Sequence, residues 1–155
     1  MGVPELKIEV ASRPEAADIL CSPSECAEVG WLVSIGDAHD ELPVGYDNVP
    51  RKLRLLIADV VTELGATEDD VWQIIRLAED LRSGTGRVLI HCEAGVSRSS
   101  AAALIIYACW LGPGCEPEAM GRVRAQRPIA IPNRRMVELA DRLLERGGRL
   151  VGVPG

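Results

Sequence analysis

Phenylalanine is absent from the sequence, and aromatic residues make up only 3% of its 155 residues. The core must therefore be built from Val, Ile, Leu and Ala. Hydrophobic residues make up 47% and charged residues 26%, proportions that are ordinary for a soluble globular protein. No internal repeat, low-complexity segment or linker interrupts the chain. We therefore expect residues 1–155 to form a single domain.

An excess of positive charge is also missing. The formal net charge is −6 and the sequence pI is about 5.0, which argues against a nucleic acid or an anionic membrane as partner. No apolar run approaches the ~18 residues that a membrane span needs. The start of the chain has none of the marks of a signal peptide. Five cysteines without a secretion signal predict free thiols and a cytoplasmic location.

Short apolar runs alternate with helical patterns along the chain. We expect strands at residues 6–10, 31–35, 53–57 and 87–90. We expect helices at residues 12–20, 67–83, 99–110, 117–126 and 133–146, the first opened by a capping box and the last ended by Gly147 and Gly148. This alternation predicts an α/β fold, with a mainly parallel sheet of about four to five strands flanked by helices. The strand before His91 is apolar throughout, as a central strand should be.

One segment, HCEAGVSRS at residues 91–99, combines residue types that suit phosphate chemistry. It lies between an expected strand and a buried helix, where backbone N–H groups and the helix N-terminus favour an anion. Gly95 lets the backbone turn tightly, and Arg98 offers a planar fork for two phosphate oxygens. The same positive field favours the thiolate form of Cys92, which is the nucleophilic form.

This segment resembles the signature His-Cys-x5-Arg-Ser/Thr of the cysteine-dependent protein tyrosine phosphatases, in the form closest to the dual-specificity branch. The resemblance implies that Cys92 is the nucleophile and that Arg98 binds the phosphate and the transition state. Ser99 would hydrogen-bond the Cys92 sulfur and help it to leave, and His91 would orient the loop. The N–H groups of the loop would bind the phosphate oxygens; they belong to Glu93, Ala94, Gly95, Val96, Ser97 and Arg98. No cofactor or metal is implied.

The resemblance extends beyond the loop and covers roughly residues 50–146. The family carries a general-acid Asp about thirty residues before its cysteine, and Asp59 stands 33 residues before Cys92, directly after an expected strand. Downstream, Arg127-Pro128 and Pro132-Asn133 resemble the segment before the family's last helix, so Arg127 and Asn133 are candidate supports for the loop. Residues 1–30 match no part of the family's pattern.

Several alternatives remain open at this point. Asp37 also follows an expected strand and competes with Asp59 as general acid, as does the group of Glu63, Asp69 and Asp70, although the last two suit a helix start. His39 and the cysteine spacings predict no metal site.

We expect a metal-independent phosphomonoester hydrolase that acts on a phosphorylated protein, with phosphotyrosine as the default substrate. The alternatives are a phosphatase for a small phosphorylated metabolite, an inactive phosphate-binding pseudophosphatase, and a sulfurtransferase of the rhodanese kind. Glu93 and the absence of a loop lysine disfavour highly charged inositol lipids as substrates.

Overall fold

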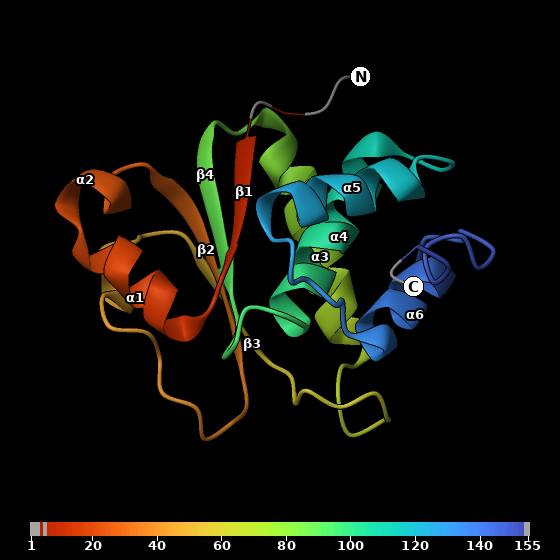
Figure 1. Ribbon diagram of the computed structural model, residues 1–155, viewed down its shortest axis with the longest axis horizontal. Coiled ribbons are helices and arrows are strands. Elements are labelled where there is room, and N and C mark those ends of the chain that lie inside the picture. The colour runs from red at the N-terminus through yellow and green to blue at the C-terminus, as the bar shows by residue number, and fades with distance from the viewer. Residues whose placement is uncertain (1–3, 5, 154–155) are drawn as a thin grey trace.

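A four-stranded, wholly parallel sheet forms the centre of the computed structural model, which describes residue 4 and residues 6–153 (Figure 1). The strand order is β1-β4-β2-β3. The strands are β1 (Leu6–Ala11), β2 (Val29–Gly36), β3 (Lys52–Leu56) and β4 (Gly86–His91). The expected parallel α/β sheet is confirmed, and β4 occupies the central position that its apolar sequence predicts.

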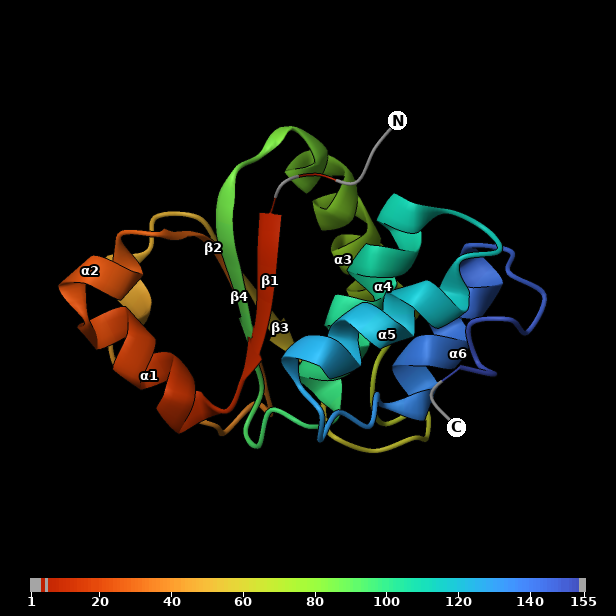
Figure 2. The same cartoon turned by 45° about the horizontal axis from the view of Figure 1, so that its top comes forward.

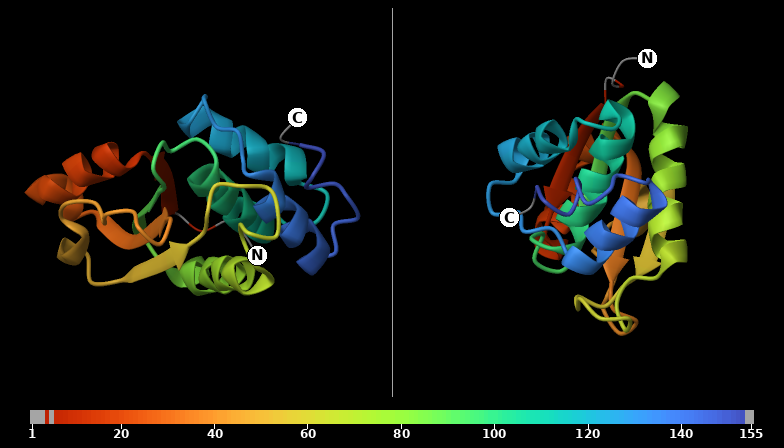
Figure 3. Two further views of the ribbon diagram at one scale, coloured as in Figure 1. Left: turned by 90° about the horizontal axis from the view of Figure 1, so that it is seen from below. Right: turned by 90° about the vertical axis from the view of Figure 1, so that its right-hand side faces the viewer.

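Helices cover both faces of this sheet, as Figures 2 and 3 show. One face carries α1 (Arg13–Cys21) and α2 (Pro23–Cys26). The other carries α3 (Glu68–Asp80), α4 (Arg98–Leu111), α5 (Glu116–Gln126) and α6 (Arg134–Leu143). Two short 3₁₀ turns lie at Tyr46–Asn48 and Leu81–Ser83. None of the helices in these described ranges is long and apolar enough to cross a membrane.

Three expected helix caps are confirmed. Ser12 and Glu15 form a capping box at the start of α1, and Thr67 and Asp70 form another at the start of α3. The side chain of Asn133 accepts a hydrogen bond from the N–H of Met136 and caps α6. Each cap satisfies backbone N–H groups that have no partner within the helix, so these local signals in the sequence carry through to the structure.

The core is aliphatic, as the lack of phenylalanine requires. The segment 101–106 of α4 consists of Ala and branched aliphatic residues, each 0% exposed. Helix α4 packs against β4, α3, α5 and α6, so it is buried nearly all round. A helix in this position is fixed firmly relative to the sheet, and so is the loop that precedes it.

The sequence analysis missed one helix and misplaced the ends of others. Helix α2 was not predicted, because its single turn gives no periodic signal. Helix α4 begins at Arg98, one residue early. Helix α6 ends at Leu143, well before Gly147, because Glu145 takes a φ of 55°. The carboxylate of Asp141 then accepts hydrogen bonds from later N–H groups, including that of Leu150 at 2.8 Å, and draws the chain back.

All four strands point the same way, so the segments that follow them gather at one edge of the sheet. These segments begin after Ala11, Gly36, Leu56 and His91. The loop from Cys92 to Ser97 follows the central strand and therefore lies among the other three. This edge is where the sequence-predicted site residues meet.

Candidate active site

Cys92 lies at the end of β4, just before α4 begins at Arg98. The residue is 2% exposed, and its Sγ lies 3.0 Å from the hydroxyl oxygen of Ser99. Ser99 is on the first turn of α4 and is itself fully buried. The structure therefore places Ser99 where its hydroxyl group can donate a hydrogen bond to the sulfur.

The backbone from Cys92 to Ser97 turns all its carbonyl groups toward protein donors. The pairs are Cys92 with His91 Nδ1 (3.0 Å), Glu93 with the N–H of Arg13 (3.0 Å), Ala94 with Arg127 Nη2 (3.3 Å), Gly95 with Arg127 Nε (3.0 Å), Val96 with the N–H of Ile131 (2.9 Å) and Ser97 with the N–H of Asn133 (2.9 Å). In a trans peptide the N–H points opposite to the carbonyl. The N–H groups of residues 93–98 are therefore directed away from these donors, toward the inner side of the loop.

Gly95 makes this curvature possible. Its φ is +69°, in the left-handed region that L-residues other than glycine adopt at a cost. A Cβ at this position would lie 2.6 Å from the backbone of both Ala11 and Ser12. The loop is therefore packed directly against the junction between β1 and α1.

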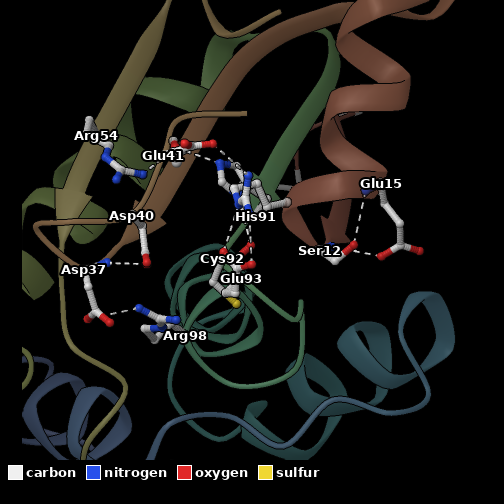
Figure 4. Close-up of polar contacts among 12 residues, drawn as sticks. Ser12, Glu15, Asp37, Asp40, Glu41, Arg54, His91, Cys92, Glu93 and Arg98 are labelled. Atoms are coloured by element: carbon white, nitrogen blue, oxygen red, sulfur yellow. Dashed lines mark hydrogen bonds and ion pairs between the residues drawn. The ribbon is translucent and has the colours of Figure 1, made fainter. Parts of the chain in front are cut away.

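One nitrogen of the Arg98 guanidinium, Nη1, contacts other residues of the protein. This nitrogen donates to the carbonyl of Ile57 at 2.8 Å and lies 3.5 Å from Oδ1 of Asp37, a pair that Figure 4 shows facing one another. The side chain is 6% exposed. Its Nε is buried and has no hydrogen-bond partner among the described residues. This leaves the Nε edge of the fork for an anion.

The structure brings both leading acid candidates to the loop. Oδ1 of Asp59 accepts hydrogen bonds from Ser97 Oγ at 2.9 Å and from Asn133 Nδ2 at 3.1 Å. Asp37 instead faces Arg98. Asp69 and Asp70 lie in the first turn of α3, where they suit the helix dipole. Glu63 is exposed in the segment between β3 and α3.

The start of α1 supports the loop, although residues 1–30 have no counterpart in the family's pattern. Arg127 donates to two loop carbonyls and also pairs with Glu15, its Nη2 at 2.8 Å from Oε1. The hydrogen bond from Arg127 lowers the pKa of Glu15 to about 2. Arg13 donates to Glu93 through Nε at 2.9 Å and lowers the pKa of that carboxyl as well. The capping-box motif shows only the local role of Glu15, so its contact with Arg127 was missed.

A line of buried polar side chains lies behind Cys92. His91 is 1% exposed, and its Nε2 lies 2.6 Å from Oγ of Ser34, which also accepts from Arg54 Nη1 at 2.9 Å. Burial lowers the pKa of His91 and so favours the neutral ring. The sequence reasoning missed Ser34 and Arg54. Their only signal was a serine and an arginine in otherwise apolar strands.

The rim of the site combines acidic and apolar groups. The side chains of Glu41 and Glu93 are 90% and 48% exposed. Val60, Ile129 and Ile131 are also exposed, on segments that hydrogen-bond to the loop or to Asn133. His39 is exposed in the segment after β2, and no metal-holding group of His, Cys, Asp and Glu occurs among the described residues.

No family model matches the chain. Over 58 residues, or 37% of this chain, the sequence is 45% identical to "Protein phosphatase Slingshot homolog 3" of Rattus norvegicus. The matched stretch covers 9% of the rat protein's length, so the similarity concerns a small part of that protein.

The fold has clear counterparts among solved structures. Human DUSP28 gives a TM-score of 0.67 at 21% identity, with 89% of this chain and 91% of that chain covered. PTPMT1, solved in complex with PI(5)P, gives a TM-score of 0.66 at 14% identity, with 90% of each chain covered. The chain therefore has the fold of the dual-specificity phosphatases, and in its fold and signature loop it resembles the cysteine-dependent protein tyrosine phosphatase superfamily.

Proposed function

We propose that the protein is a phosphomonoester hydrolase that works through a cysteinyl-phosphate intermediate at Cys92. The observation that carries this proposal is the set of six loop carbonyls held outward, which directs six N–H groups to the opposite side, beside a buried thiol. Preorganised donors of this kind stabilise the charge that develops on a transferring phosphoryl group. Together with the Arg98 cation they supply positive charge without the need for a metal.

In the first step, the thiolate of Cys92 attacks phosphorus in line and the bond to the leaving oxygen breaks. A protonated carboxyl group gives its proton to that oxygen. In the second step, a water molecule attacks the phosphorus, the same carboxylate takes a proton from the water, and the S–P bond breaks. Ser99 donates a hydrogen bond to the departing sulfur, which its 3.0 Å contact with Sγ supports.

We assign the acid role to Asp59. Asp37 forms an ion pair with Arg98, whose guanidinium the phosphate needs, whereas Asp59 is hydrogen-bonded to Ser97 of the loop. The two hydrogen bonds to Asp59 both go to Oδ1 and come from neutral groups, so Oδ2 would carry the proton. Asp59→Asn should lower kcat by about 10²-fold or more. If Asp37→Asn lowers it instead, the assignment is wrong.

The substrate class that fits this rim best is a phosphorylated protein segment. Exposed Ile129 and Ile131 offer apolar contact to a peptide or an aryl ring, and the exposed carboxylate of Glu41 disfavours polyanionic metabolites. We expect phosphotyrosine to be the phosphorylated residue in that segment.

One assay tests the reaction itself. The purified protein should hydrolyse an aryl phosphate in the presence of EDTA, be inhibited by vanadate and lose turnover on Cys92→Ser. Cys109→Ser is a matched control, because burial raises the pKa of that thiol to about 11 and keeps it unreactive. A folded protein that binds vanadate but turns over no substrate would contradict the enzyme claim and favour a phosphate-binding module.

A further inference from the structure

The buried line behind Cys92 crosses three neighbouring strands. Arg54 on β3 is in register with Ser34 on β2, and Ser34 is in register with His91 on β4. The contacts are 2.9 Å from Arg54 Nη1 to Ser34 Oγ and 2.6 Å from Ser34 Oγ to His91 Nε2. The line ends at the carbonyl of Cys92, which lies 3.0 Å from His91 Nδ1.

The protons along this line have one consistent arrangement. A carbonyl only accepts, so the proton of the neutral His91 ring must be on Nδ1, and Nε2 must accept. An arginine only donates, so Ser34 Oγ accepts from Arg54 and gives its own proton to His91 Nε2. Every bond therefore points from Arg54 toward the carbonyl of Cys92.

That carbonyl belongs to the peptide unit whose N–H is on Glu93, the first of the loop N–H groups. Hydrogen bonds in a chain polarise one another, so a bond to the carbonyl strengthens this N–H as a donor. It also fixes the plane of the peptide. The guanidinium of Arg54, at the far end of the line, adds positive potential on the same side.

Stability alone does not explain this arrangement. Ser34 is 0% exposed and His91 1% exposed, and burying polar groups costs free energy that apolar residues at these positions would not incur. Space is also kept for the cation, because a Cβ on Gly36 would lie 2.9 Å from Nη2 of Arg54. Gly36 has no positive φ that would require a glycine for its backbone.

We propose that Ser34 and Arg54 are positioning residues that orient neutral His91 and, through the first peptide of the loop, increase the fraction of Cys92 present as thiolate. Neither side chain touches the substrate. Any effect of Ser34 and Arg54 on turnover rests on the proposed phosphatase function. Their effect on the Cys92 thiol does not rest on it, and can be measured without any substrate.

The test is the pH dependence of Cys92 alkylation by iodoacetamide, followed by mass spectrometry of the peptide that contains Cys92, so that the other four cysteines do not interfere. In Ser34→Ala, the pH of half-maximal rate should rise by about one unit, corresponding to a tenfold smaller ratio of thiolate to thiol at any given pH. Arg54→Met should shift it in the same direction, because it removes the cation and its hydrogen bond to Ser34 Oγ.

Arg87→Gln is the matched control. Arg87 is a partly buried guanidinium on β4 that pairs with Glu9 and lies at the opposite end of the strand from Cys92. Its loss should leave the alkylation profile unchanged. An unshifted profile in folded Ser34→Ala, or an equal shift in Arg87→Gln, overturns the proposal. If Ser34→Ala does not fold, Arg54→Met decides by the same criterion. A shifted profile in a protein without phosphatase turnover would uphold this inference while the proposed function fails.

Discussion

Replacing Gly95 with alanine tests whether the loop is held against the β1–α1 junction as described. The added Cβ would lie 2.6 Å from three atoms: the carbonyl carbon of Ala11, the backbone nitrogen of Ser12 and Nη2 of Arg127. Two of these are backbone atoms and cannot rotate away. The loop must therefore move off the junction, and the hydrogen bonds that hold its carbonyls must lengthen.

Two costs contribute to the expected effect. An L-residue in the left-handed region costs about 1–2 kcal/mol, and overpacking at a tight contact costs about 1–3 kcal/mol. Together they predict a loss of about 2–5 kcal/mol in the free energy of unfolding. In a domain of this size each 1 kcal/mol lowers Tm by roughly 2–4 °C. We expect Gly95→Ala to melt at least about 5 °C lower, consistent with those costs, and to bind vanadate more weakly.

Circular dichroism melting and vanadate titration measure both effects. Gly121→Ala is the control, because no atom lies within 4 Å of the added Cβ and the position is in helix α5. That variant should be as stable as the wild type or slightly more so. If Gly95→Ala melts with the wild type and keeps its vanadate affinity, the packing of the loop against residues 11 and 12 does not hold it, and the reasoning is refuted.

Three further predictions concern charged groups. The pKa of Glu15 is lowered from 4.5 to about 2, so its ion pair with Arg127 stabilises the fold above about pH 4.5 and is lost as the pH falls toward 2. The Glu15 side chain is 52% exposed, so the pair is worth about 1 kcal/mol. Glu15→Gln should therefore flatten the acid side of a Tm–pH curve, and an unchanged slope would count against the pair. Glu116→Gln should cost about 3–5 kcal/mol in urea unfolding, because it leaves the 4%-exposed Arg146 without its 2.6 Å partner; a loss under 1 kcal/mol would mean that the pair is not buried in solution. Glu41→Lys should improve turnover of acidic phosphopeptides relative to basic ones severalfold at low salt, because it reverses a charge on the rim of the site. The gain should shrink as salt is added, since salt screens exposed charges. A gain independent of salt would exclude the rim charge as its cause.

The parts of the fold that could be predicted are those with local causes. The caps at Ser12, Thr67 and Asn133 depend on residues three positions apart, so the sequence alone reveals them. The apolar strand expected at residues 87–90 and the helix after it predict the central β4 and the buried α4. The motif between them predicts the loop, because the strand, the glycine, the arginine and the helix start are all within one short segment.

The parts that could not be predicted depend on register and on distant packing. Arg54 and Ser34 are 20 residues apart, Ser34 and His91 are 57 apart, and Arg127 and Glu15 are 112 apart. No local pattern indicates which residue of one strand lies opposite which residue of another, since tertiary packing fixes that register. The same limit applies to the acid. Asp37 and Asp59 each follow a strand of one parallel sheet, so both were bound to reach the loop.

The contacts of the loop also give the first residues of the chain a role in the site. The resemblance to the phosphatase signature covers residues 50–146, yet the carbonyl of Glu93 is held by the N–H of Arg13, and Arg127 is braced by Glu15. The edge strand β1 delivers these residues to the loop through its register with β4. A cradle made of backbone N–H groups takes its shape from the groups that hold the carbonyls of the same peptides. Its geometry therefore depends on donors from separate segments, and residues outside the recognisable motif determine how well it binds an anion.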